Sequence, residues 1–147
     1  MGDKVRVLLV DDEPSIVKMV GKRLEVEGFD VLVAMDGQEG LKKAQTESPD
    51  VMILDVMLPK LNGYEVCTML KQDTRYQQMP IIMFSAKAQD KDAQTGLACG
   101  ANAYVCKPFK AQELLDQIRA VCPRAASTGR AAPPAESGGT TQPVATQ

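Results

Sequence analysis

Residues 51–65 read VMILDVMLPKLNGYE, and they carry the pattern from which a fold can be inferred. The first four residues are large and apolar without polar alternation, which is typical of a short strand buried on both faces of a sheet. Asp55 ends this run, and Pro59, Asn62 and Gly63 then supply residue types that favour turns. Helical periodicity begins at the end of the stretch. The pattern therefore predicts a buried strand, a turn and a helix.

The same alternation extends in both directions over residues 4–122. Five short runs rich in β-branched or large apolar residues are predicted strands: residues 5–10, 30–35, 51–54, 81–84 and 103–106. Four other segments place apolar residues on one helical face: Ile16, Val20 and Leu24; Leu41 and Ala44; Val66, Met69 and Leu70; and Leu114, Leu115, Ile118 and Val121. Residues 90–99 form a weaker helix candidate, because their apolar stripe is thin and Gly96 lies inside it. Strands alternating with helices predict an α/β fold, a doubly wound five-stranded parallel sheet with helices on both faces.

The composition changes near Pro123. Residues 123–147 contain no aromatic residue and only Val144 as a larger aliphatic side chain. Such a segment buries too little apolar surface to offset the entropy of ordering it. We therefore predict a folded domain over residues 1–122 and a disordered tail or linker, rich in Pro, Ala, Gly and Thr, over residues 123–147.

The overall composition excludes several classes of function. The chain has no histidine, which removes imidazole general bases, Ser-His-Asp triads and histidine metal ligands. Its formal net charge of -2 gives no electrostatic reason to expect nucleic-acid or membrane binding. Its four cysteines lack C-x-x-C spacing, so we expect reduced thiols rather than a zinc or redox site. No signal peptide and no apolar run of membrane-spanning length is present, which predicts a cytoplasmic location.

Polar side chains follow four of the five predicted strands. Asp11 and Asp12 come directly after the first strand, and Asp55 ends the third. Ser85 follows the fourth strand and Lys107 follows the fifth. In an open α/β sheet the ligand site forms beyond the carboxyl ends of the strands. The sequence therefore predicts that these five side chains meet on one rim.

Three carboxylates without a histidine or a pair of thiolates are typical of a hard-cation site, and Mg²⁺ fits best. A lysine and a hydroxyl group opposite the metal would complete a clamp for a phosphoryl group. The nucleophile would then be a carboxylate, and Asp55 is the natural choice at the end of the central strand. Each residue alone also has a structural interpretation, since Asp12 could simply cap the next helix.

Four motifs, in order and with family-like spacing, carry a resemblance over residues 4 to about 122. They are VLLVDDEP at 7–14, ILDVMLPKLNGYE at 53–65, IIMFSA at 81–86 and GANAYVCKPF at 100–109. Together they resemble the receiver domain of two-component response regulators, the CheY-like family. The resemblance implies a flavodoxin-like sheet with the strand order 2-1-3-4-5.

The resemblance also implies a role for each residue on the rim. It makes Asp55 the phosphoacceptor and gives Mg²⁺ the ligands Asp11, Asp12, Asp55 and the backbone carbonyl of Met57. Asp11 and Asp12 point apart in an extended strand end, so one would bind the metal directly and the other through water, and which is which stays open.

Further roles follow from the same resemblance. Ser85 and Lys107 are expected to contact the phosphoryl oxygens, and a cis peptide is expected between Lys107 and Pro108. Phosphorylation adds charge and strong acceptor oxygens, so the resemblance implies that Ser85 moves toward them and that Tyr104 rotates into the vacated space. The rearranged surface would be the fourth helix, the fifth strand and the fifth helix.

The function expected on this basis is a phosphoacceptor switch of a two-component phosphorelay, rather than a separate enzyme, although it would catalyse its own dephosphorylation. Its partners would be a sensor histidine kinase or phosphotransfer protein and a downstream protein target. Whether it stands alone or belongs to a longer regulator stays open, as does a phosphorylation-dependent homodimer. The main alternative is an Asp-based, Mg²⁺-dependent phosphohydrolase, but Asp55-Val56-Met57 lacks the second acid of a D-x-D signature. A flavin or nucleotide carrier would favour a glycine-rich phosphate loop that the chain lacks.

Overall fold

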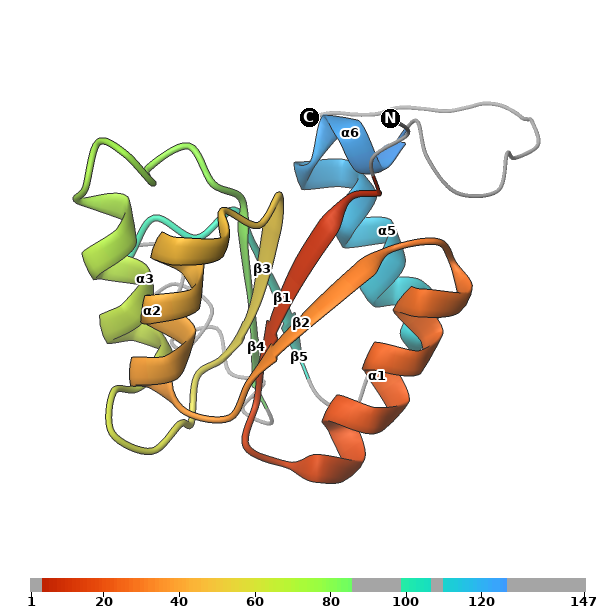
Figure 1. Ribbon diagram of the computed structural model, residues 1–147, viewed down its shortest axis with the longest axis horizontal. Helices are drawn as coiled ribbons and strands as arrows, with labels where there is room; N and C mark the ends of the chain where they lie inside the picture. The colour runs from red at the N-terminus through yellow and green to blue at the C-terminus, as the bar shows by residue number, and fades with distance from the viewer. Residues whose placement is uncertain (1–3, 86–98, 107–109, 127–147) are drawn as a thin grey trace.

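The computed structural model describes residues 4–85, 99–106 and 110–126. Five parallel strands form one sheet in the order β2-β1-β3-β4-β5 (Figure 1). The strands are β1 (Arg6–Val10), β2 (Asp30–Ala34), β3 (Val51–Asp55), β4 (Ile81–Ser85) and β5 (Ala103–Cys106). The predicted fold class, strand order and parallel pairing are confirmed.

Helices cover both faces of the sheet. They are α1 (Pro14–Val26), α2 (Gly37–Glu47), α3 (Gly63–Lys71), α5 (Ala111–Val121) and α6 (Pro123–Ala126). In Figure 1, α1 and α5 lie on one side of the sheet and α2 and α3 on the other. The predicted helix at residues 90–99 lies almost wholly outside the described residues.

Successive residues of β1 enter different cores. Val7 and Leu9 belong to a buried cluster with α1 and α5, whereas Leu8 and Val10 belong to a second cluster with α2 and α3. All four side chains are fully buried. Because side chains alternate across a strand, a strand buried on both faces must be apolar throughout, which is the pattern that the sequence shows.

Local sequence signals set where the helices begin. Pro14 is the first residue of α1, where its missing N–H costs nothing. Asp36 caps α2 by accepting from the Glu39 N–H, and Asn62 and Glu65 form a reciprocal capping box at α3. These caps place the starts of α2 and α3 beside the carboxyl end of the sheet.

Side chains of α2 also contact the outer edge of β2. The Lys43 ammonium donates to the Val33 carbonyl at 2.6 Å, and a Glu39 oxygen accepts from the Met35 N–H at 2.8 Å. Lys43 and Glu39 are themselves paired at 3.2 Å. One helix face thus occupies a backbone acceptor and a backbone donor at the end of the sheet's edge strand.

Two features differ from the sequence pattern. Met69 shares the helical spacing of the buried residues of α3, but its side chain is 47% exposed, because it lies at the margin of that face. A short helix also lies beyond residue 122, since α6 follows α5 and Ala125 is fully buried in the cluster under α1 and α5. None of the helices in the described ranges combines the length and apolar character that a bilayer span requires.

Candidate phosphoacceptor and metal site

The carboxyl ends of the two central strands bring the buried acids together. Val10 of β1 pairs with Leu54 of β3, so Asp11 and Asp55 are the next residues in register. The Asp11 N–H donates to the Ala34 carbonyl at 3.1 Å, which extends the contact with β2 by one residue. Both acids are therefore positioned by backbone pairing of the sheet.

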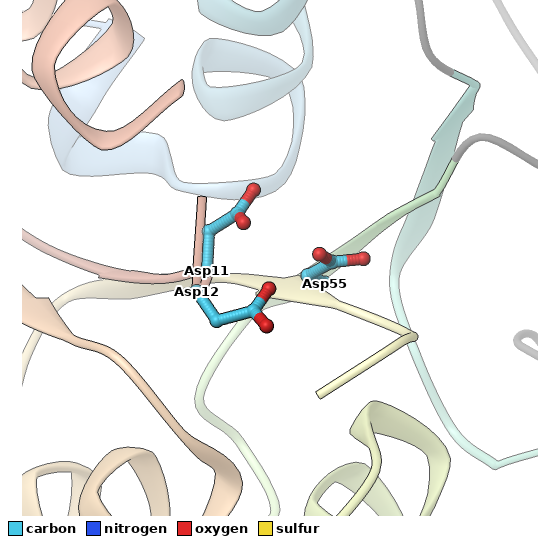
Figure 2. A group of neighbouring side chains, drawn as sticks. All are labelled: Asp11, Asp12 and Asp55. Carbon is cyan, nitrogen blue, oxygen red and sulfur yellow. The ribbon is translucent and has the colours of Figure 1, made fainter. Parts of the chain in front are cut away.

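Three carboxylates converge at this point. One side-chain oxygen each from Asp11, Asp12 and Asp55 lies within 4.8 Å of the others. Figure 2 shows Asp11 and Asp12 projecting to different sides of the chain, with Asp55 beside them on the neighbouring strand. Asp11 is fully buried and Asp55 is 4% exposed, whereas Asp12 is exposed. The cluster thus has a buried floor and one acid at the solvent side.

The two buried carboxylates each accept a hydrogen bond from a nearby backbone N–H. Asp11 Oδ1 accepts from the Glu13 N–H at 2.8 Å, and Asp55 Oδ1 accepts from the Met57 N–H at 3.2 Å. In each case an aspartate binds the backbone two residues further on, as in an Asx turn. Each side chain is thereby held while the chain turns away from its strand.

The interpretation of Asp12 as a helix cap is not supported. The residue at the cap position of α1 is Glu13, and it makes no side-chain cap hydrogen bond. Asp12 instead lies within the acidic cluster. Its place in the sequence is therefore explained by the site and not by the helix.

The electrostatics of the cluster favour a hard cation. Carboxylates that are ionised and this close repel one another, and taking two of them out of water adds a desolvation cost. A divalent ion with oxygen preference offsets both effects. The three side chains fit Mg²⁺, because they offer carboxylate oxygens and no soft ligand. The residues that follow Asp55 in the chain can add a backbone carbonyl oxygen.

The loop after Asp55 is held close to the strand by a glycine. The Gly63 N–H donates to the Val56 carbonyl at 2.9 Å, and a Cβ at Gly63 would lie 2.3 Å from the Asp55 carbonyl oxygen. Only glycine permits that approach. The sequence predicts a turn at Asn62 and Gly63, and the structure adds that Gly63 lies against the backbone of Asp55.

Of the remaining predicted site residues, the structure describes Ser85 and Tyr104. Ser85 is the last residue of β4, and it pairs in register with Cys106, the last residue of β5. Lys107 and Pro108 lie outside the described residues, so their roles stay predictions. Tyr104 lies in β5 opposite Met83, half-buried against the cluster under α2 and α3. Its role as a switch stays a prediction.

Comparisons with known proteins agree with this arrangement. The family model described as the response regulator receiver domain matches residues 7–119. The alkaline phosphatase synthesis transcriptional regulatory protein PhoP of Bacillus subtilis is 47% identical over 119 residues, which is 81% of this chain and 49% of PhoP. The chain spans about half the length of the curated relatives it matches.

Solved structures show the same likeness. The chemotaxis response regulator CheY4 of Vibrio cholerae has 36% sequence identity and a TM-score of 0.76, covering 81% of this chain and 99% of its own. A BeF3-activated DrrB receiver domain has 32% identity and a TM-score of 0.73, covering 81% and 97%. With the fold, the acidic site and these matches in agreement, the chain belongs to the response regulator receiver domain family, in its CheY-like form.

Proposed function

We propose that Asp55 accepts a phosphoryl group from the phosphohistidine of a sensor histidine kinase or phosphotransfer protein. The observation that carries the proposal is the convergence of Asp11, Asp12 and Asp55 at the carboxyl ends of adjacent central strands. Asp55 stands on β3 in the middle of the sheet, and its carboxylate is oriented by the Met57 N–H. A positioned carboxylate beside two further acids is suited to covalent phosphoryl transfer.

The chemical step follows from that placement. An oxygen of Asp55 attacks phosphorus, a P–O bond forms, and the P–N bond to the partner's imidazole breaks. Bound Mg²⁺ would neutralise charge on the transferred group, and we propose Asp11, Asp12, Asp55 and the Met57 backbone carbonyl as its ligands. Ser85 and Lys107 are proposed to contact the phosphoryl oxygens. Water would later release the group, so the domain is a switch that dephosphorylates itself and not a separate enzyme.

The proposed structural response to phosphorylation involves β4 and β5, at one edge of the sheet. Ser85 ends β4 opposite Cys106 of β5, and Tyr104, two residues before Cys106, is half-buried. We propose that Ser85 and Tyr104 change position together and alter the surface of β5, α5 and the helix expected at residues 90–99. The modification shifts a population between two existing states, and a downstream protein would bind one of them.

The setting of the domain is also proposed. PhoP is named as a transcriptional regulatory protein, and this chain matches about half of it. We propose that the chain is the receiver part of such a regulator, with residues 123–147 largely serving as the linker to an output region. The net charge of -2 supports protein contacts rather than nucleic-acid binding by this domain in the cytoplasm.

Intact mass spectrometry tests the proposal. The protein is incubated with acetyl phosphate, with and without Mg²⁺, as wild type and as Asp55→Asn. We expect one Mg²⁺-dependent gain of about 80 Da, labile to base, in the wild type only. If the wild type gains no mass, binding of BeF3⁻ with Mg²⁺ separates a short-lived adduct from a missing one. A wild type that takes neither the phosphoryl group nor BeF3⁻ refutes the proposed function.

A further inference from the structure

The loop between β3 and α3 contacts the first residues of α2. Figure 1 shows this loop running past the first turn of that helix. The Gly37 N–H donates to the Pro59 carbonyl at 3.2 Å, and the Lys60 ammonium lies 3.5 Å from an Asp36 carboxylate oxygen. A backbone hydrogen bond and an ion pair therefore join the start of α2 to a loop more than twenty residues further along the chain.

The approach of Gly37 is closer than any side chain would allow. A Cβ at Gly37 would lie 1.8 Å from the Leu61 carbonyl oxygen and 2.6 Å from its carbon. Both atoms belong to backbone, which cannot rotate away as a side chain could. A larger residue at position 37 must therefore displace either the loop or the start of α2.

The loop is also conformationally strained where α2 touches it. Lys60 has a φ of 71°, and the Leu61 N–H donates to the Pro59 carbonyl at 2.8 Å, closing a tight turn around Lys60. A non-glycine residue keeps such a φ only when its surroundings enforce it. The Pro59 carbonyl accepts from Gly37 as well as from Leu61, so α2 is part of that enforcement.

Charge at the same place favours the closed arrangement. The pKa of Asp36 lies below its usual value, first because its side chain accepts from the Glu39 N–H and then because Lys60 is close. Asp36 is thus an anion that caps α2 and attracts Lys60 at once. The Lys60 side chain is 59% exposed, so solvent screens the ion pair and it should contribute less than the backbone contact of Gly37.

We propose that Gly37, aided by the Asp36–Lys60 pair, is a positioning residue for the site: it sets the path of residues 57–61 and so the place of the Met57 carbonyl and N–H. The metal-binding consequence rests on the proposed function. Mg²⁺ requires near-ideal octahedral geometry, so a small displacement of the Met57 backbone weakens binding. Neither Gly37 nor Lys60 contacts the metal in this proposal.

NMR titration tests the proposal on the full chain. Gly37→Ala is compared with wild type and with Ala44→Gly, which disturbs a buried position of α2 away from the loop. In metal-free samples we expect the Met57 amide resonance to move in Gly37→Ala and to stay in place in Ala44→Gly. On adding Mg²⁺ alone, we expect the affinity of Gly37→Ala to fall by about tenfold or more, with Ala44→Gly within about twofold of wild type.

A Gly37→Ala protein that binds Mg²⁺ within twofold of wild type overturns the proposal. If Gly37→Ala does not fold, Lys60→Met takes its place, since it removes the ion pair and leaves α2 and the positive φ at position 60 unchanged. We expect its Mg²⁺ affinity to fall by about two- to fivefold, and an unchanged affinity contradicts the proposal. A wild type that binds no Mg²⁺ refutes the proposed function instead, and the Met57 resonance then decides by itself whether α2 positions the loop.

Discussion

Replacing Asp12 with asparagine should raise the thermal stability of the metal-free protein and greatly reduce its stabilisation by Mg²⁺. The change keeps the size and shape of the side chain and removes one charge from a cluster whose oxygens lie within 4.8 Å of one another. Asp12 is the exposed acid of the three, so water can hydrogen-bond to the amide of the asparagine that replaces it. The variant therefore isolates the repulsion among the three acids.

The magnitude follows from the geometry. Two unit charges no more than 4.8 Å apart repel by at least about 3.5 kcal/mol at an effective dielectric constant of about 20. Asp12 faces two such charges, but water and salt screen an exposed group strongly. We expect a net gain of about 1–2 kcal/mol, which corresponds to roughly 3–10 °C in Tm for a domain of this size.

Thermal unfolding followed by circular dichroism measures the effect, in EDTA and at increasing Mg²⁺. In EDTA the Tm of Asp12→Asn should exceed that of the wild type, and the difference should shrink at high salt. Added Mg²⁺ should raise the Tm of the wild type progressively and that of the variant far less, because a ligand stabilises the state that it binds. Glu25→Gln removes the same charge from an exposed position of α1 and serves as the control.

Two results would refute this reasoning. If Asp12→Asn is no more stable than Glu25→Gln in EDTA at low salt, the carboxylates do not repel one another enough to matter. If Mg²⁺ raises the Tm of Asp12→Asn as much as that of the wild type, the cation binds somewhere else.

Three further outcomes are expected. Gly63→Ala should lose about 1–3 kcal/mol or more in urea unfolding and phosphorylate slowly, because its Cβ would lie 2.3 Å from the Asp55 carbonyl oxygen; wild-type stability and rate would contradict the geometry. Cys67 should resist alkylation in the native protein at mildly alkaline pH, because burial raises its pKa to about 12; peptide mapping that finds it labelled before unfolding would count against this. Glu39→Gln should flatten the loss of stability in acid. The hydrogen bond from the Met35 N–H lowers the pKa of Glu39, so its contribution is full above its unfolded value near 4.5 and is lost as pH falls through the folded value; a urea-midpoint series that is equally steep in both proteins would argue against it.

The fold could be predicted because its strands are short, apolar and evenly interrupted. The run at residues 51–54 needed only one added residue, Asp55, to match β3. Periodicity alone did not order the strands, and the order 2-1-3-4-5 came from the family resemblance. Helical spacing also could not show that Met69 is half exposed. The spacing gives the direction in which a side chain leaves the helix, but not how far the sheet beneath that helix extends.

The site was predictable to the extent that strand ends meet at one rim. Asp11, Asp12 and Asp55 were found from their positions directly after strands, and the register of β1 and β3 brings them together. The contact between Gly37 and Leu61 could not be found in this way, because it depends on the path of two loops and leaves no periodic signal. That Asp12 alone is exposed also depends on packing around the finished rim.

The contacts of Lys43 and Glu39 with β2 restrict how this domain can associate. An edge strand with unpaired backbone groups is a template onto which another chain can add a strand. Here an ammonium occupies the Val33 carbonyl and a carboxylate occupies the Met35 N–H. A second copy that continued the sheet through β2 would have to break both contacts and separate the two charges. Dimers of this domain are therefore not expected to form by continuing the sheet through β2.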